Sequence, residues 1–156
     1  MSSYRFANTE RRFWFPLLAW IVLIYLFSTN SFSSSETSRF IVPLLKFLFP
    51  WLTASQLALG HLICRKGGHL LEYFVLGVLA WRTLGTGQTS QMKARMLVTS
   101  MIVLVALSDE FHQSFVPSRT SSVNDVGYDL VGGLAALFLI SKPRNETRSL
   151  HSYSIL

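Results

Sequence analysis

Cysteine and acidic residues are scarce in this chain, which limits the disulfides it can form and leaves it with a positive net charge. Its one cysteine, Cys64, rules out an intrachain disulfide, so the fold cannot depend on a disulfide framework. Eight acidic residues against fourteen basic ones give a formal net charge of +6. Even so, the sequence contains no run of Lys and Arg with interleaved aromatic residues, and we predict no nucleic-acid partner.

Familiar catalytic cores are missing as well. The sequence has neither H-E-x-x-H nor G-x-S-x-G, the patterns typical of zinc proteases and of serine hydrolases. A catalytic site in this chain would therefore have to combine residues that lie far apart in the sequence.

The chain is rich instead in apolar residues, which make up half of it and are gathered into four blocks. Each block approaches the roughly 20 residues of a membrane-spanning helix once its polar end is included. A soluble domain of this size has no room to bury four such segments. The sequence therefore predicts an all-α polytopic membrane protein, a four-transmembrane-helix bundle. The blocks comprise residues 13–27, 70–81, 97–107 and 126–140.

Basic residues are divided unequally between the two ends of these blocks. Nine lie on one side of the predicted membrane and five on the other, a bias that places both chain termini in the cytoplasm. We therefore expect a multi-pass protein of the bacterial cytoplasmic (inner) membrane. Residues 1–12 form a cytoplasmic segment, 13–141 the membrane domain and 142–156 a cytoplasmic tail. The first block is predicted to be a retained signal anchor, because no A-x-A-type cleavage site follows it. The pattern leaves the oligomeric state open.

Two segments between the first and second blocks receive different predictions. Residues 28–38 are rich in Ser, Thr and Asn and are expected to form an exposed loop. Residues 40–52 are very apolar but short and contain Pro43, Lys46 and Pro50, so they favour a short interfacial helix before the second span. Residues 53–64 should lead helically into that span.

Polar residues interrupt the apolar blocks at the start of the second span, the end of the third and the start of the fourth. In an alternating four-helix arrangement these three ends share one membrane face, and the charge bias makes it the outer one. Ionisable groups are costly in hydrocarbon, so a cluster of them indicates a site. The predicted binding residues are Lys66, His69, Glu72, Tyr73, Asp109, Glu110, His112, Gln113, Arg119, Asp125 and Asp129.

The fourth span carries its polar residues on one face. Asp125 and Asp129 share a stripe with Gly132 and Ala136, whose small-x-x-x-small spacing allows close contact with another helix. The two aspartates should therefore face a neighbouring helix rather than lipid.

Several chemical roles are open to the cluster. Glu72 or Glu110 can act as a general base, with His69 and His112 as acids, proton carriers or metal ligands. Each polar group can also serve structure alone, by capping a helix or by joining two helices through hydrogen bonds. We predict no cofactor and no metal site.

Three motifs in this region carry a resemblance to a known family. They are Lys66, Gly68, His69, Glu72 and Tyr73; then Ser108, Asp109, Glu110, His112, Gln113, Phe115, Val116, Pro117 and Arg119; and then Asp125 with the glycine-bearing span after it. Together, over residues 66–140, they resemble the VanZ-like family of small bacterial integral membrane proteins. The chain departs from the family at Asp129, where Asn is common, and at Ser118, where Gly is usual. The resemblance implies a role in the cell envelope, and its namesake type is linked to resistance to the glycopeptide teicoplanin.

We hold three hypotheses about function. In the first, an outer-face polar pocket binds the headgroup of an anionic lipid or cell-wall precursor, with Arg119 and Lys66 engaging the anion. In the second, the chain is an intramembrane hydrolase or transferase that uses Glu and His side chains. In the third, the polar groups only hold the helix bundle together or form a proton-linked switch. Membrane lipids are the expected partners.

Overall fold

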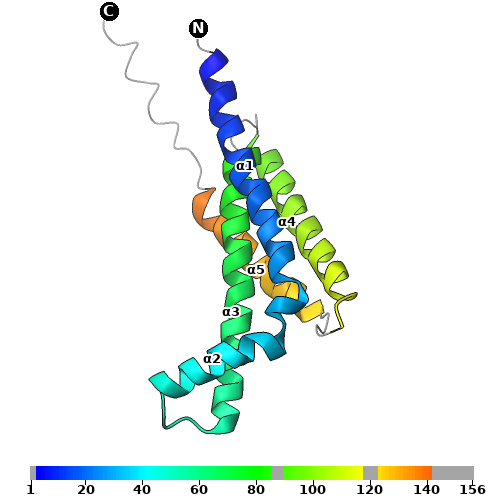
Figure 1. The fold of residues 1–156 in the computed structure, drawn as a ribbon. Coiled ribbons are helices and arrows are strands. Elements are labelled where there is room, and N and C mark those ends of the chain that lie inside the picture. Colours follow the sequence, from blue (N-terminus) through cyan, green and yellow to red (C-terminus); the bar gives the residue numbers. More distant parts are fainter. Residues whose placement is uncertain (1–2, 86–89, 118–122, 142–156) are drawn as a thin grey trace, which may run out of the picture.

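The computed structural model describes residues 3–85, 90–117 and 123–141, and within them every regular element is helical (Figure 1). For residues 3–12 and 123 only the backbone is described. The elements are α1 (Ser3–Phe27), the 3₁₀ turn η1 (Asn30–Phe32), α2 (Ser34–Leu48), α3 (Ala54–Ala80), the π-helical segment η2 (Trp81–Gly85), α4 (Gln91–Gln113) and α5 (Val123–Ile140). The predicted all-α fold is confirmed.

Helix α3 contains both the predicted lead-in and the predicted second span in one unbroken helix. Thr53 caps its start: the Thr53 side chain accepts a hydrogen bond from the Gln56 backbone, and Gln56 Oε1 accepts one from the Thr53 N–H at 2.9 Å. This reciprocal pair satisfies two backbone donors that the first helical turn leaves free.

The expected loop over residues 28–38 is wrong. Residues 30–32 form η1, and α2 begins at Ser34, with the Ser33 side chain capping it by accepting from the Glu36 N–H. Serine is common both in turns and at helix caps, because its short hydroxyl side chain bonds to nearby backbone groups in each. Composition alone therefore did not distinguish a loop from a capped helix start. Helix α2 then continues past Pro43 and ends at Leu48, before Pro50. A short helix in this region was predicted correctly, but it begins at Ser34 instead of Phe40, and its interfacial setting stays a prediction.

Helices α1, α3 and α4 run alongside one another, while α5 crosses behind them and α2 projects sideways from one end (Figure 1). Buried apolar side chains fill the space between the four long helices. They are Leu17, Ile24, Tyr73, Leu76, Ala80, Val98, Ile102, Val105, Ala106 and Leu137.

Within the described residues, no helix taken alone combines the length and the apolar character needed to cross a membrane. One pair meets both requirements together, residues 13–27 with residues 30–48, and the two segments are bent by 74°.

Candidate functional site

Helices α3 and α5 are joined by two pairs of charged side chains. The Lys66 ammonium contacts the Asp125 carboxylate, and His69 Nδ1 lies 3.0 Å from Asp129 Oδ1. Both aspartates are buried against α3, as their spacing on the fourth span predicts. Lys66 pairs with Asp125 and the later His69 pairs with the later Asp129, so the two helices run in the same direction.

Small residues continue the same seam away from the charges. A Cβ added at Gly132 would overlap the Leu70 backbone carbonyl, and one added at Gly77 would lie 2.7 Å from the Gly133 carbonyl oxygen. Backbones this close leave no room for a larger side chain. The glycines therefore bring the helices near enough for the two charged pairs to form.

A second polar cluster joins the end of α1 to the end of α4. The Ser28 hydroxyl donates to Asp109 Oδ1, and Gln113 Nε2 donates to Asp109 Oδ2 at 2.9 Å and to Ser28 Oγ at 3.2 Å. All three side chains are buried. Nearby, the Tyr25 hydroxyl donates to Ser108 Oγ at 2.6 Å. Much of the Ser108–Gln113 motif thus anchors α1, because a buried carboxylate needs donors of this kind.

A cavity of about 250 Å³ lies between these two clusters and is enclosed by the end of α1, η1, α2 and α3. One face of α3 lines it, formed by Arg65, Gly68, His69 and Glu72, which follow the i, i+3, i+4, i+7 spacing of a helix stripe. The remaining lining residues are Phe27, Ser28, Phe32, Thr37, Ile41 and Cys64.

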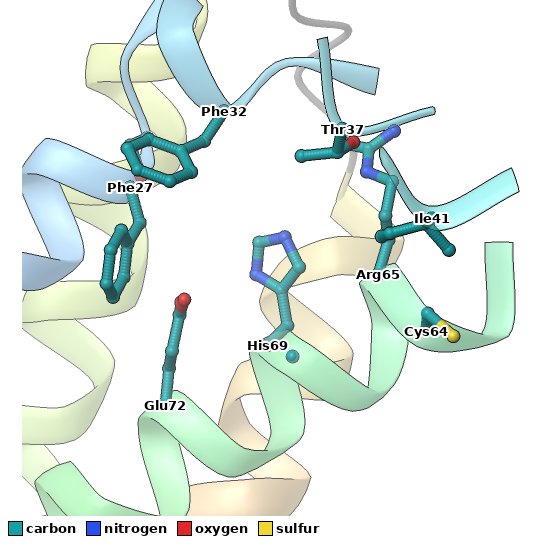
Figure 2. A pocket seen from close by; sticks show the side chains of 10 residues that line it. Phe27, Phe32, Thr37, Ile41, Cys64, Arg65, His69 and Glu72 are labelled. Atoms are coloured by element: carbon teal, nitrogen blue, oxygen red, sulfur yellow. The ribbon is translucent and has the colours of Figure 1, made fainter. Parts of the chain in front are cut away.

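Figure 2 shows how these side chains lie. The His69 ring and the Glu72 carboxylate project from α3 into the cavity, with Phe27 and Phe32 on one side and Arg65 and Thr37 on the other. Since Asp129 holds the Nδ1 edge of His69, Nε2 is the ring nitrogen that can meet a ligand. The cavity therefore offers a cation, an oriented imidazole and a carboxylate beside apolar walls.

The predicted site residues that the structure describes divide among four places. His69 and Glu72 line the cavity, whereas Lys66 lies on the α5 side of α3 with its ammonium on Asp125 and 5.1 Å from the Tyr128 ring centre. Asp109, Gln113 and His112 lie at the α1–α4 contact, His112 packing edge-on against the Tyr25 ring. Tyr73, Glu110 and Asp129 are buried between helices. Arg119 lies outside the described residues, so its role stays a prediction.

Two of the buried groups keep unused hydrogen-bonding capacity. Neither the Tyr73 hydroxyl nor Asp129 Oδ2 has a hydrogen-bond partner among the residues that the structure describes. Both lie within the bundle, where unmade hydrogen bonds cost free energy.

Sequence reasoning missed Arg65, the cation that lines the cavity. Its signal was present, because Arg65 lies four residues before His69 and seven before Glu72, on one helix face. The anion-binding role was assigned to the neighbouring Lys66 instead, because Lys66 belongs to the family-like motif. Thr37 and Phe32 were missed because they lie in the segment predicted to be a loop.

The described residues contain no group of three or more His, Cys, Asp or Glu side chains close enough to hold a metal ion. Ser28 and Gln113 hold the Asp109 carboxylate, and His69 lies beside one oxygen of Asp129.

Comparison with known families supports the likeness that the motifs carry. The family model described as VanZ/LLP1 matches residues 13–142, which is most of the chain. The chain belongs to the VanZ/LLP1 family. The match begins within α1, at Phe13, and so extends the family to the helix that carries no motif. No curated protein and no solved structure shows significant similarity to the chain.

Proposed function

We propose that this VanZ/LLP1-family chain is a membrane protein of the bacterial envelope, with α1, α3, α4 and α5 as four spans and both termini in the cytoplasm. Its burial pattern supports this setting. Phe15 and Phe138 are 79% and 82% exposed, whereas Asp109 and Asp129 are 1% and 0% exposed. A protein surrounded by water favours the opposite distribution.

The same burial pattern explains why the helices are not uniformly apolar. The four acidic residues of α4 and α5 lie between helices, whereas large apolar side chains such as Leu104 and Phe138 face outward. Paired, inward-facing ionisable groups are the arrangement that hydrocarbon tolerates.

The cavity then binds the anionic headgroup of a lipid or of a cell-wall precursor. The observation that carries this proposal is the joint lining of one half-open cavity by Arg65, His69 and the apolar Phe27, Phe32 and Ile41. A guanidinium suits phosphate or carboxylate, and mixed apolar and polar walls are typical of small-molecule sites. Lys66 is engaged by Asp125, so Arg65 takes the leading role, and Arg119 remains a proposed second cation. A link to teicoplanin resistance is part of the same proposal.

Lipids that copurify in a mild detergent, identified by native mass spectrometry, test the headgroup proposal. Arg65→Gln should lose a bound anionic lipid by about tenfold or more, the effect of removing one charge-assisted contact. Arg39→Gln is the matched control, because Arg39 lies on α2, is exposed, lines neither cavity and pairs with Glu36 in an i, i+3 contact. Equal lipid content in wild type and Arg65→Gln would overturn the proposal.

One observation favours the hydrolase or transferase alternative. Asp129 orients the His69 ring while that ring and Glu72 face the cavity, an arrangement that suits acid–base transfer to a bound headgroup. Incubating the purified protein with the copurified lipid and following products by mass spectrometry tests it. Release of a headgroup that is lost in His69→Gln would support catalysis, and an unchanged lipid would count against it.

A further inference from the structure

A second cavity adjoins the first. It has a volume of about 150 Å³ and lies between η1 and α2, bounded by Ser31, Phe32, Glu36, Thr37, Phe40 and Ile41. Phe32, Thr37 and Ile41 line both cavities, so the two cavities are adjacent.

Two of the three polar side chains around the second cavity, those of Glu36 and Thr37, are already engaged. The Thr37 hydroxyl lies 2.8 Å from the Ser33 carbonyl oxygen and 3.1 Å from His61 Nε2. The Glu36 carboxylate is 3.1 Å from the Arg39 guanidinium. What remains for a ligand is the apolar surface of Phe32, Phe40 and Ile41, which suits hydrocarbon and not a hydrated headgroup.

We propose that the ligand is a single amphiphile that lies across both cavities, with its anion beside Arg65 and His69 and the first part of its hydrocarbon chain against Phe32 and Phe40. This inference rests on the proposed headgroup function and names the class of ligand: a chain-bearing lipid rather than a free phosphate or soluble precursor.

The surface of α2 supports this occupant. Phe40 is 76% exposed and Phe47 81% exposed, so the second cavity opens beside a continuing apolar surface. A hydrocarbon chain that leaves the second cavity there stays in contact with apolar groups, whereas the cationic Arg65 lies at the headgroup end of the proposed ligand. Charge at one end and hydrocarbon at the other match the two ends of an anionic lipid.

The only cysteine provides a direct assay. Cys64 is exposed and lines the first cavity but not the second. Its rate of alkylation by maleimide therefore reports whether the first cavity is occupied. The full-length protein is placed in nanodiscs of phosphatidylcholine. Long-chain phosphatidic acid, glycerol 3-phosphate and diacylglycerol are then compared as protecting agents.

We expect long-chain phosphatidic acid to slow the alkylation of Cys64, diacylglycerol to leave it unchanged, and glycerol 3-phosphate to need at least about tenfold higher concentration, since it lacks the chain's apolar contacts. Phe40→Ala should weaken protection by phosphatidic acid about tenfold and leave glycerol 3-phosphate unaffected. Phe47→Ala is the matched control, because Phe47 is exposed on the same helix and lines neither cavity.

Two results would overturn the inference in distinguishable ways. If glycerol 3-phosphate and phosphatidic acid protect equally and Phe40→Ala behaves as wild type, the second cavity does not bind a lipid chain. The headgroup proposal is then unaffected. No protection by any of the three compounds removes both proposals together.

Discussion

His69 belongs to two environments at once, and this is the clearest functional feature at the scale of single residues. Its Nδ1 contacts Asp129 on α5, while the rest of its ring faces the cavity beside Glu72. Any change in the α3–α5 contact therefore reaches a ligand through the orientation of this one ring. Lys66, one helical turn earlier, contacts α5 instead, through the Asp125 carboxylate and the Tyr128 ring.

Two substitutions of Asp129 distinguish the contribution of its hydrogen bond to His69 from the contribution of its negative charge. Asn keeps an oxygen that accepts from Nδ1, so Asp129→Asn should unfold within about 1 kcal/mol of wild type, while Asp129→Ala loses about 2–3 kcal/mol. Thermal unfolding in detergent, followed by circular dichroism, measures both. Asn is also common at this position in the family. Equal stability of the Ala and Asn variants would show that the bond contributes nothing.

Gly68 offers a way to fill the cavity without disturbing the fold. A Cβ added at Gly68 or at Gly67 meets no atom within 4 Å, but only Gly68 lines the cavity. Gly68→Leu should abolish lipid copurification, whereas Gly67→Leu retains it, and each should raise stability by up to about 1 kcal/mol through helix propensity. Lipid mass spectrometry and melting curves on the same samples check both parts. Lipid retained by Gly68→Leu would place the ligand elsewhere.

At the scale of elements, α3 and α5 form the most extensive helix contact in the described residues, and their packing was the part most open to prediction. The spacing of Asp125, Asp129 and Gly132 fixed which face of α5 turns inward, because helical periodicity is local information. The position of α2 was not predictable in the same way. It depends on contacts between distant segments, such as Thr37 with His61 and Leu45 against Gly60.

The apolar walls of the cavity were missed for the same reason. The polar face of the cavity on α3 follows from the sequence, since His69 and Glu72 were both predicted site residues. Its apolar walls, Phe32 and Ile41, come from η1 and α2, and their approach to α3 is a tertiary outcome. Periodicity assigns a residue to a face but does not say what that face meets.

Two glycines of α5 make a matched test of the close contact. Gly132→Ala places a Cβ on the Leu70 carbonyl and should cost about 1–3 kcal/mol, the usual effect of overpacking. Gly127→Ala meets no atom within 4 Å and should gain about 0.5–1 kcal/mol from helix propensity. Chemical unfolding of both variants in detergent decides. If Gly132→Ala is no less stable than Gly127→Ala, the helices are not held by backbone proximity.

At the scale of the whole molecule, several acidic side chains are buried while many large apolar side chains are exposed. The buried set includes Asp109, Asp125 and Asp129, and the exposed set includes Phe15, Phe47 and Phe138. In the proposed membrane setting, the two joined helix pairs, α3 with α5 and α1 with α4, place their polar contacts near the same end of the bundle. The cavity opens at that end, next to α2.

The proposed orientation places Cys64 near the outer surface of the membrane. A membrane-impermeant maleimide should therefore label Cys64 in intact spheroplasts. Gln91→Cys in a Cys64→Ser background should be labelled only after lysis, because Gln91 begins α4 on the cytoplasmic side in this proposal. The reverse pattern would invert the topology, and labelling of both positions in intact cells would contradict the four-span arrangement.

The parallel seam between α3 and α5 also limits how the family can change length. Each residue inserted into a helix rotates everything beyond it by about 100°, since a turn takes 3.6 residues. An insertion between His69 and Gly77 would keep the charged pairs but turn Gly77 away from Gly133, and Gly133 would then meet a larger side chain. Insertions and deletions should therefore be confined to the connections between helices, and relatives of very different length should share one fixed spacing from Lys66 to Gly77.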